Sequence, residues 1–383
     1  MNFYPDTDRR ESVARIRHAA REFAEQELRP VVMDYDETQT FPFEIVHKLG
    51  ELGFMGALAP PTYGGRGLSA LEFIAIVEEL SRVDPSVGLI VSAHNALGVG
   101  HLLAFGTDEQ KRRFLPKLCT GQALGAWCLT EPEAGSDSGG MQTRAVNDGD
   151  CWILNGSKAF ITHGSVASTY TVMAVTGQEN GKKRISAFIV ERGMEGFTVG
   201  KPLNKLGMRS SDTAALSFTD VRVPSAQMIG NEGEGLRQAM AMLDGGRIGI
   251  AALGVGLAQG ALDASIAYVK RRKQFGKTLS EFQAIQWKLA EMHTRIEAAR
   301  LLTEKAALLK VKGEPYNSAA SQAKYFASET AELAANEAVQ MHGGNGFIKD
   351  YPVEKFYRDA KLLTIGEGTT EVQKMIIAKH LLR

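Results

Sequence analysis

The amino-acid texture of the chain changes twice along its length, and this limits the folds that it can adopt. The first and last parts carry apolar residues at helical spacing, whereas residues 123–224 break into short β-branched and aromatic runs. Turn signals such as Asn147-Asp148-Gly149 separate these runs. The sequence therefore predicts a helical part, a middle antiparallel β barrel or sandwich, and a second helical part.

Start signals support the helices of the first part. Ser69 and Glu72 form a capping box ahead of an apolar run, and Thr107 with Gln110 forms another. In such a box the two side chains satisfy backbone N–H groups reciprocally, so a helix is expected to begin at each site.

The last part carries the longest periodic segments. Helices are expected at residues 236–270, 282–312, 317–341 and 370–382. Three of them are long enough to suggest an up-down bundle. A capping box of Thr370 and Gln373 is expected to open the last one.

Composition limits the classes of function. A chain of 383 residues predicts two or three domains, and its 44 basic and 44 acidic residues create no global field for nucleic acid or an anionic membrane. Three cysteines without metal-ligand spacing indicate a reducing compartment and argue against a zinc site. The first residues lack a signal-peptide pattern, and the longest apolar stretch, 248–262, is too short to span a bilayer. A cytoplasmic protein is expected.

One glycine-rich stretch resembles a dinucleotide fingerprint. Gly254, Gly256 and Gly260 have the wrong spacing, however, and lie inside a predicted helix rather than at a strand-to-helix turn. They are interpreted as small residues that let helices approach closely. The chain also has no Walker A sequence, no HExxH and no nucleophile elbow, so a Rossmann-type nicotinamide enzyme is not expected.

Glu367 is the candidate catalytic base. It lies between Gly366 and Gly368, on backbone that can adopt unusual dihedrals and approach a ligand closely. The loop stands at the start of a predicted helix, where negative charge is favoured. The alternative is a helix-capping loop with an ordinary surface glutamate.

Two further segments carry groups suited to a flat polar ligand. The segment from Trp127 to Asp137 offers backbone N–H groups and the hydroxyls of Thr130 and Ser136. After it, Phe160 could stack on a heterocycle while Thr162 bonds its edge. Alternatively, Phe160 belongs to the core and Thr162 to a turn.

Two segments in the last part suit phosphate or close backbone approach. Residues 270–277 form a basic cluster, which is either a cationic helix end or an arginine site for phosphate. Residues 340–346 contain more glycines than a helix C-cap requires, so another backbone or a cofactor could come close.

Together these segments resemble the acyl-CoA dehydrogenase family. Both long signatures of that family, Gly125 to Asp137 and Gln340 through Asp359, occur in order with the basic Gln-Phe-Gly stretch and the Glu-Gly-Thr loop. The resemblance implies an N-terminal helical domain (1–122), a middle β domain (123–232) and a C-terminal four-helix bundle (233–383). It also implies a homotetramer active in fatty acid β-oxidation.

The resemblance implies FAD as the cofactor, held between the middle and C-terminal domains and completed by a neighbouring subunit. The residues expected to contact the flavin or its ribityl, phosphate and adenosine groups are Leu129, Thr130, Phe160, Thr162, Arg272, Phe275, Gln283, Gln340, Gly343, Gly344, Thr369 and Glu371. Those expected to line the acyl-CoA path are Ser136, Asp244, Arg247, Gly366 and Gly368.

The implied reaction is α,β-dehydrogenation of an acyl-CoA to the trans-2-enoyl-CoA. Glu367 would remove the α-proton, its backbone N–H and the FAD ribityl chain would bond the thioester oxygen, the β-hydrogen would leave as hydride to the flavin, and electron-transferring flavoprotein would receive the electrons. Some family members take the base from the position before Arg247, but Gly246 stands there. That supports Glu367.

The substrate implied is a short- to medium-chain acyl-CoA, because residues 243–251 look most like the short-chain (butyryl-CoA) branch. Residues 85–97 contain no arginine, which disfavours a glutaryl-type substrate. Gly366 replaces a common tyrosine and Phe160 a common tryptophan, so a branched or cyclic acyl group is an alternative. Further alternatives are an acyl-CoA oxidase, a flavin monooxygenase or a DNA-binding flavoprotein, of which the last conflicts with the neutral charge.

Overall fold

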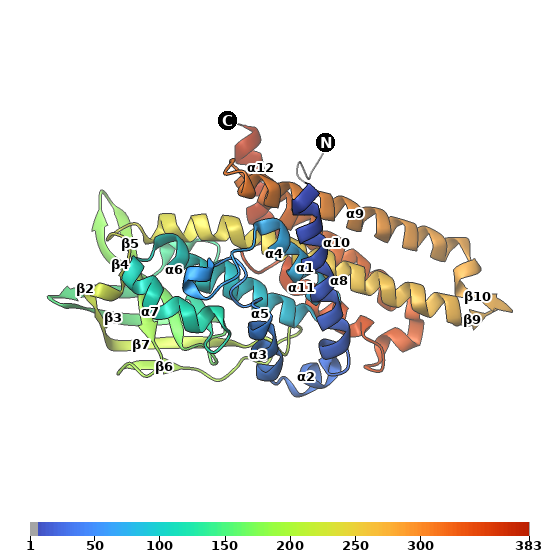
Figure 1. Cartoon of the computed structure of the whole chain (residues 1–383), viewed down its shortest axis with the longest axis horizontal. Coiled ribbons are helices and arrows are strands. Elements are labelled where there is room, and N and C mark those ends of the chain that lie inside the picture. The colour runs from blue at the N-terminus through green and yellow to red at the C-terminus, as the bar shows by residue number, and fades with distance from the viewer. Residues whose placement is uncertain (1–6, 383) are drawn as a thin grey trace.

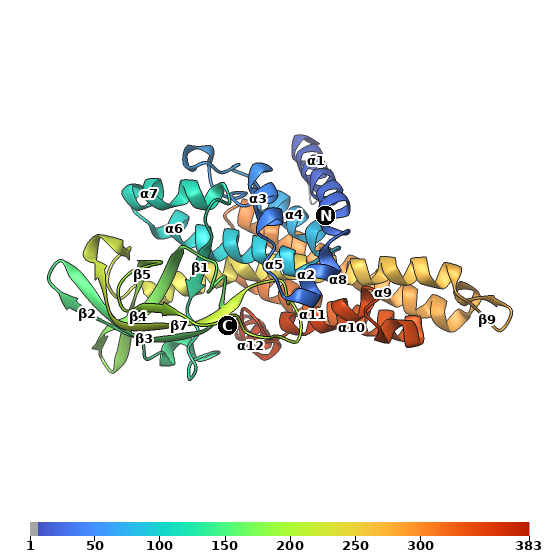
Figure 2. The same cartoon turned by 90° about the horizontal axis from the view of Figure 1, so that it is seen from below.

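The computed structural model describes residues 7–382 and shows the three parts in the expected order (Figure 1). N-terminal helices cover one side, the strands lie at one end, and long C-terminal helices extend to the other end (Figures 1 and 2). Helix α8 (Gly235–Arg271) belongs to both ends, since it contacts strands of the sheet near its start and the small hairpin β9–β10 near its finish. This single helix ties the parts together.

The N-terminal part is built around one fully buried helix. Every residue of α4 (Ala70–Ser81) is buried, with α1 on one side and α8 on another. Both expected capping boxes are present, at Ser69 with Glu72 and at Thr107 with Gln110. The other helical segments are α1 Thr7–Phe23, η1 Ala24–Leu28, α2 Val32–Thr38, α3 Phe43–Glu51, η2 Pro61–Tyr63, α5 Pro85–Ala93, η3 His94–Val99, α6 Gly100–Phe105 and α7 Asp108–Cys119.

Two helical segments are long and apolar enough to cross a membrane by length and composition. They are residues 85–105 and α8, and their most apolar windows are 83% and 72% buried inside the protein. Helices that form the core of a folded domain have the same composition. Burial on this scale identifies both as core helices.

The middle part is one sheet with strand order β6-β7-β3-β2-β4-β5-β8, and β1 joins it beside β4. Its strands are β1 Gly125–Cys128, β2 Arg144–Asp148, β3 Cys151–Thr162, β4 Thr169–Glu179, β5 Lys182–Glu191, β6 Phe197–Val199, β7 Thr213–Pro224 and β8 Met228–Ile229. Between β1 and β2 lies the short η4 Ser138–Gly140, and η5 Ser225–Gln227 precedes β8. Within residues 7–382 the end strands β6 and β8 do not pair with each other, so the path is open.

The expectation of a purely antiparallel sheet was wrong at β4. Strand β1 runs parallel to β4, and Arg144 of β2 meets Val175 of β4 in a parallel bridge. The reason is topological: the β2–β3 hairpin lies between β1 and β4 in the chain, so β4 returns to the sheet in the direction of β1. Local alternation of side chains does not encode this direction.

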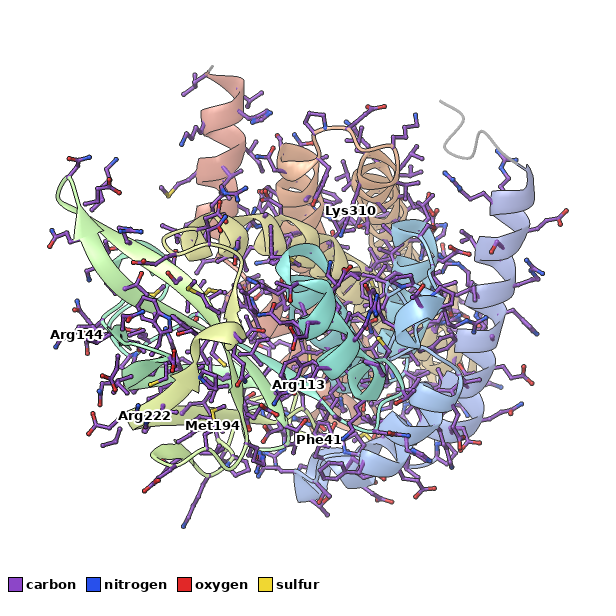
Figure 3. All side chains as sticks on the ribbon, turned by 60° about the vertical axis from the view of Figure 1, so that its left-hand side comes forward. Phe41, Arg113, Arg144, Met194, Arg222 and Lys310 are labelled. Atoms are coloured by element: carbon purple, nitrogen blue, oxygen red, sulfur yellow. The ribbon has the colours of Figure 1, made fainter. Side chains whose placement is uncertain are left out.

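Ion pairs join the sheet to the N-terminal helices. Arg113 of α7 donates to Glu191 at the end of β5 over 2.6 Å, and Figure 3 shows Arg113 in front of the sheet. Arg144 of β2 and Arg222 of β7 instead extend away from the sheet, and both are exposed. The contact between Arg113 and Glu191 helps to hold the sheet against helix α7.

The C-terminal part contains the four expected helices: α8, α9 Gln283–Val311, α10 Asn317–His342 and α12 Thr370–Leu381. The sequence did not single out α11 (Val353–Leu363), the hairpin β9 Lys273–Gln274 with β10 Lys277–Thr278, or the short η6 Leu279–Glu281 and η7 Gly343–Phe347. The apolar residues of α11 do recur at helical spacing and are buried, so the sequence carried a signal for this helix: Val353, Phe356, Ala360 and Leu363.

The glycines of α8 allow close packing, as interpreted from the sequence. A Cβ atom on Gly256 would lie 2.2 Å from the backbone oxygen of Glu78, and one on Gly260 would lie 2.2 Å from that of Arg82. A Cβ atom on Gly254 would lie 3.0 Å from the oxygen of Ala327 in α10. These glycines therefore bring α8 against the end of α4 and against α10.

Candidate active site

Glu367 lies on the loop between α11 and α12 in a left-handed backbone conformation. Its φ is 52°, and that of Gly368 is 90°. A non-glycine residue in this region is uncommon and marks a loop whose shape is imposed by its surroundings. The conformation turns the side chain of Glu367 inward toward α8 rather than into solvent.

The expected capping box at Thr370 and Gln373 was wrong by one residue. Thr369 is the N-cap, and its side chain accepts from the backbone N–H of Val372 at 3.3 Å. Gln373 instead turns back, and its Nε2 donates to the oxygens of Glu367 (3.4 Å) and Gly368 (2.9 Å). Its amide therefore stabilises the Glu367 loop instead of capping the helix.

The carboxylate of Glu367 is buried and incompletely satisfied. The residue as a whole is half-buried, yet its Oε2 is inaccessible and has no hydrogen-bond partner among the described residues. It rests on Gly246 of α8, where a Cβ atom would lie 2.2 Å from Oε2. Burial raises the pKa of Glu367 to about 7, against the opposing effect of the Lys324 and Arg247 charges.

Arg247 and Asp244 lie on the same helix as Gly246. Arg247 Nη1 donates to Asp244 Oδ1 at 2.5 Å, while the buried Nε of Arg247 has no partner in the described chain. Burial raises the pKa of Asp244, and the Arg247 charge opposes it. Lys310 of α9, labelled in Figure 3, points its Nζ toward Gly245, where a Cβ atom would lie 2.9 Å away. The structure thus brings four of the five expected substrate-path residues to one place beside Glu367: Asp244, Arg247, Gly366 and Gly368.

The loop after β1 is held by a buried ion pair that the sequence did not single out. Lys158 Nζ donates to Glu131 Oε1 at 2.8 Å and to the backbone oxygen of Leu129 at 3.1 Å. The N–H of Ala159 donates to the oxygen of Thr130 at 2.9 Å. Both carbonyl groups are therefore occupied on the strand side of the loop. A signal existed, because Lys158 has the same strand parity as the buried Trp152 and Leu154 of β3.

Phe160 and Thr162 stand at the end of β3 beside that loop. Phe160 is 69% exposed with φ 55°, at a register shift between β3 and β7. A bulge of this kind re-aims a side chain, and here it presents an aromatic face instead of burying it. The alternative that Phe160 is a core residue was wrong. A bare ring next to Leu129, Thr130 and Thr162 fits one face of a flat heterocycle.

Several of the remaining residues expected to bind the cofactor lie at the other end of the molecule. Arg272 and Phe275 are at the β9–β10 hairpin, which Figures 1 and 2 show at the end of the molecule opposite the sheet. Phe275 is 92% exposed, and a Cβ atom on Gly343 or Gly344 would meet nothing within 4 Å. One chain does not bring these residues to Phe160.

Five further expected residues lie near one of these regions or near the Glu367 loop. Gln283 and Gln340, at the start of α9 and near the end of α10, are exposed. Thr369 is half-buried and Glu371 is exposed beside the Glu367 loop, while Ser136 is exposed on the loop after β1. The expected cofactor site thus divides into a part around the sheet and a part around the hairpin.

Comparisons with known proteins identify the family. The family models for the acyl-CoA dehydrogenase N-terminal, middle and C-terminal domains match residues 10–122, 126–221 and 233–382. The chain is 49% identical to the short-chain specific acyl-CoA dehydrogenase of Clostridium acetobutylicum, over 96% of this chain and 97% of the relative. It is 43% identical to the mitochondrial short-chain specific enzyme of Bos taurus, over 99% and 92%.

Solved structures give the same result. Butyryl-CoA dehydrogenase from Megasphaera elsdenii superposes with a TM-score of 0.95 at 43% identity, covering 100% of both chains. A chain in a structure of the electron transferring flavoprotein of Acidaminococcus fermentans superposes with a TM-score of 0.96 at 46% identity, also covering 100% of both. The chain therefore belongs to the acyl-CoA dehydrogenase family, whose members are FAD-dependent oxidoreductases.

Proposed function

We propose that this protein converts a short- to medium-chain acyl-CoA to the trans-2-enoyl-CoA, with Glu367 as the catalytic base. The observation that carries the proposal is a buried carboxylate oxygen without a partner, on a left-handed loop against Gly246. A structural carboxylate in such a place would be paired. An unpaired carboxylate with a pKa near 7 is suited to take a proton at neutral pH.

The reaction balances around one carboxylate. Glu367 takes the α-proton, and the electron pair of that C–H bond forms the double bond as the β-hydrogen leaves with its pair. FAD, when bound, supplies the acceptor for that hydride. The residues around the exposed face of Phe160 would hold its ring system, and those of a neighbouring subunit's hairpin would hold its phosphates and adenosine.

The backbone of Glu367 can assist the proton transfer. Its N–H has no acceptor in the part of the chain that the structure describes. A donor placed there would bond the thioester oxygen as negative charge develops on it, which is the largest contribution in many such reactions. The base and the oxyanion donor would then belong to the same residue.

The proposed acyl group is short because the relatives named above are short-chain enzymes. Gly366 bears on the alternative of a branched or cyclic group. A Cβ atom there would lie 3.5 Å from Leu362, an ordinary contact, so the position is open rather than closed by packing. A similar chain in Clostridium sporogenes is a 3-(aryl)acrylate reductase at 44% identity. A bulky acyl group therefore belongs in any substrate panel.

The proposed assembly is a cytoplasmic homotetramer that passes electrons to electron-transferring flavoprotein. The separation of the sheet from the hairpin within one chain supports a cofactor site completed by a second subunit. Domain boundaries at 122/123 and 232/233 fit the start of β1 and of α8. We propose an open sandwich for the middle domain, and a bundle of α8, α9, α10 and α11 for the last.

An anaerobic titration tests the function directly. FAD-loaded protein is mixed with straight, branched, cyclic and aryl acyl-CoAs while the oxidised flavin band is followed. Rapid bleaching by one class, lost in Glu367→Gln, is the expected result and identifies the acyl group. If dithionite reduces the flavin but no acyl-CoA does, the proposal is wrong. Rapid reoxidation of the bleached enzyme by air would favour the oxidase and monooxygenase alternatives.

A further inference from the structure

Lys324 is a buried cation on α10 next to the Glu367 loop. Its side chain has no solvent exposure and lies in a stripe of small buried residues that includes Ala320, Ala323 and Ala327. Its Nζ donates to the backbone oxygen of Gly368 at 2.6 Å. Among the described residues no carboxylate forms a hydrogen bond or ion pair with it.

Such an arrangement needs a reason, because burying an unpaired ammonium group costs more than the hydrogen bond returns. Burial lowers the pKa of Lys324 to about 8, and the charges of Glu367 and Glu371 oppose that effect. The group therefore keeps its proton at neutral pH.

A neutral tie between α10 and the same loop region already exists. One turn further along α10, Ser328 Oγ lies within hydrogen-bond distance of two backbone oxygens, that of Leu363 at 2.9 Å and that of Lys324 at 2.7 Å. A hydroxyl group makes this contact without the cost of a buried charge. The charge of Lys324 therefore contributes something that a hydrogen bond alone does not.

We infer that Lys324 is the positioning residue for the catalytic base: its ammonium holds the carbonyl that follows Glu367, and its charge favours the ionised carboxylate. The inference rests on the proposed function of Glu367. The charged groups around Lys324 are Glu367 on the loop, Arg247 on α8 and Glu371 on α12. Arg247 is the second cation that acts on Glu367. Without Lys324, only Arg247 would oppose the effect of burial on the base.

The consequence is a shift in pH dependence with a definite sign. Burial raises the pKa of Glu367, and the two cations lower it. Removing the charge of Lys324 therefore raises the pKa of the base further. The acid limb of kcat/KM, which reports the free enzyme, moves to higher pH.

The test uses FAD-loaded enzyme in four forms: wild type, Lys324→Met, Lys324→Arg and the control Ser328→Ala. For Lys324→Met we expect the acid limb to move up by about one pH unit and kcat/KM at pH 7 to fall about fivefold or more. Lys324→Arg keeps the charge, so the acid limb of its kcat/KM profile should lie at the wild-type pH. Ser328→Ala removes a neighbouring hydrogen bond but no charge. Its rate can fall, but the acid limb of its kcat/KM profile should stay at the wild-type pH.

The outcomes separate the two proposals. If Lys324→Met lowers the rate but leaves the acid limb at its wild-type pH, Lys324 is only a structural tie and the inference is wrong. If Glu367→Gln retains activity, the proposed base itself is wrong, whatever Lys324 does.

A second measurement tests the inference if Lys324→Met folds poorly. Deuterium exchange at the α-carbon of 3-thiabutyryl-CoA reports proton abstraction without oxidation, and it can be followed in Lys324→Gln and Lys324→Arg. Exchange with the same pH midpoint in both would overturn the inference. A higher midpoint in Lys324→Gln alone would support it.

Discussion

At the scale of single residues, the site depends on two positions far apart in the chain. Glu367 needs the space over Gly246, since a methyl group there would overlap its Oε2. Because residue 246 is glycine, no carboxylate occupies the position before Arg247 from which some family members take the base. Glu367 therefore supplies the base, and Gly246 leaves the space that its carboxylate occupies.

Gly246→Ala should raise stability while lowering activity. Alanine in a helix interior is more favourable than glycine by about 0.5–1 kcal/mol. Its Cβ atom, however, would lie 2.2 Å from Glu367 Oε2, so the flexible carboxylate must move. We expect an unchanged or higher Tm with kcat reduced by about 10²-fold, within the range for loss of a positioned base.

Gly366→Ala is the matched control for that variant. A Cβ atom at 366 makes only ordinary contacts of 3.5 Å with Leu362, and the residue has no positive φ. The base should stay in place, so kcat for a short straight acyl-CoA should change little. Equal losses of kcat in both variants would contradict the steric argument.

The acid limb of the wild-type kcat/KM profile should lie near pH 7. Only the ionised carboxylate can accept a proton, and burial raises the pKa of Glu367 to about 7. Activity is therefore expected to fall as pH decreases through 7. A pH series with a substrate that does not ionise in this range checks it, and a limb near pH 4.5 would contradict the burial of the base.

The same shift predicts a pH-dependent stability effect of Glu367→Gln. A folded pKa of about 7 against an ordinary 4.5 means that the stability contribution of Glu367 is present below pH 4.5 and is lost as pH rises through 7. Glutamine does not ionise, so the variant should match wild type near pH 5. At pH 9 the free energy of unfolding of the variant should exceed that of the wild type by up to about 3 kcal/mol. Chemical denaturation at both pH values measures the difference, and the same difference at both would contradict the expectation.

At the scale of elements, the loop after β1 depends on the buried pair of Lys158 and Glu131. Glu131 also accepts from the backbone N–H groups of Gln142 (2.5 Å) and Thr143 (3.0 Å), so the pair closes both ends of the loop. Its contacts cross from β3 to the start of β2. The loop that is expected to meet the flavin is thereby braced against the sheet.

Lys158→Met should destabilise the protein by about 3–5 kcal/mol, because Glu131 would remain buried without its partner. The double variant Lys158→Met with Glu131→Leu should recover part of that loss, since no charge is left unpaired. Denaturant unfolding measures stability, and retention of FAD on dilution measures the loop. A double variant no better than the single would argue against an unpaired charge as the cause.

At the scale of the whole molecule, the expected cofactor residues are split between two ends of one chain. Among residues 7–382, the one aromatic ring that Phe275 meets is that of Phe282, edge-on at 6.3 Å between ring centroids. Such an exposed ring contributes little to the fold of the chain that carries it. Its expected role lies in another subunit's site.

Phe275→Ala should therefore weaken FAD binding without changing the stability of the apo chain. We expect an unchanged Tm for apo protein and about a tenfold higher Kd for FAD, as lost stacking predicts. Val146→Ala, at an exposed apolar residue of the sheet, is the control and should leave both unchanged. A lower apo Tm with unchanged FAD affinity would show that the hairpin serves its own chain.

The sequence by itself determined the order of helical, β and helical parts, the long helices and the loop that carries Glu367. These features depend on local periodicity, capping residues and glycine, which neighbouring residues encode. It did not reveal the parallel pairing of β1 with β4, the contact of the Glu367 carboxylate with Gly246, or the hydrogen bond from Lys324 to the Glu367 loop. Those contacts join residues more than 40 positions apart, so only the tertiary structure decides them. The order of strands in the sheet decides the first, and the packing of α8 and α10 around the loop decides the other two.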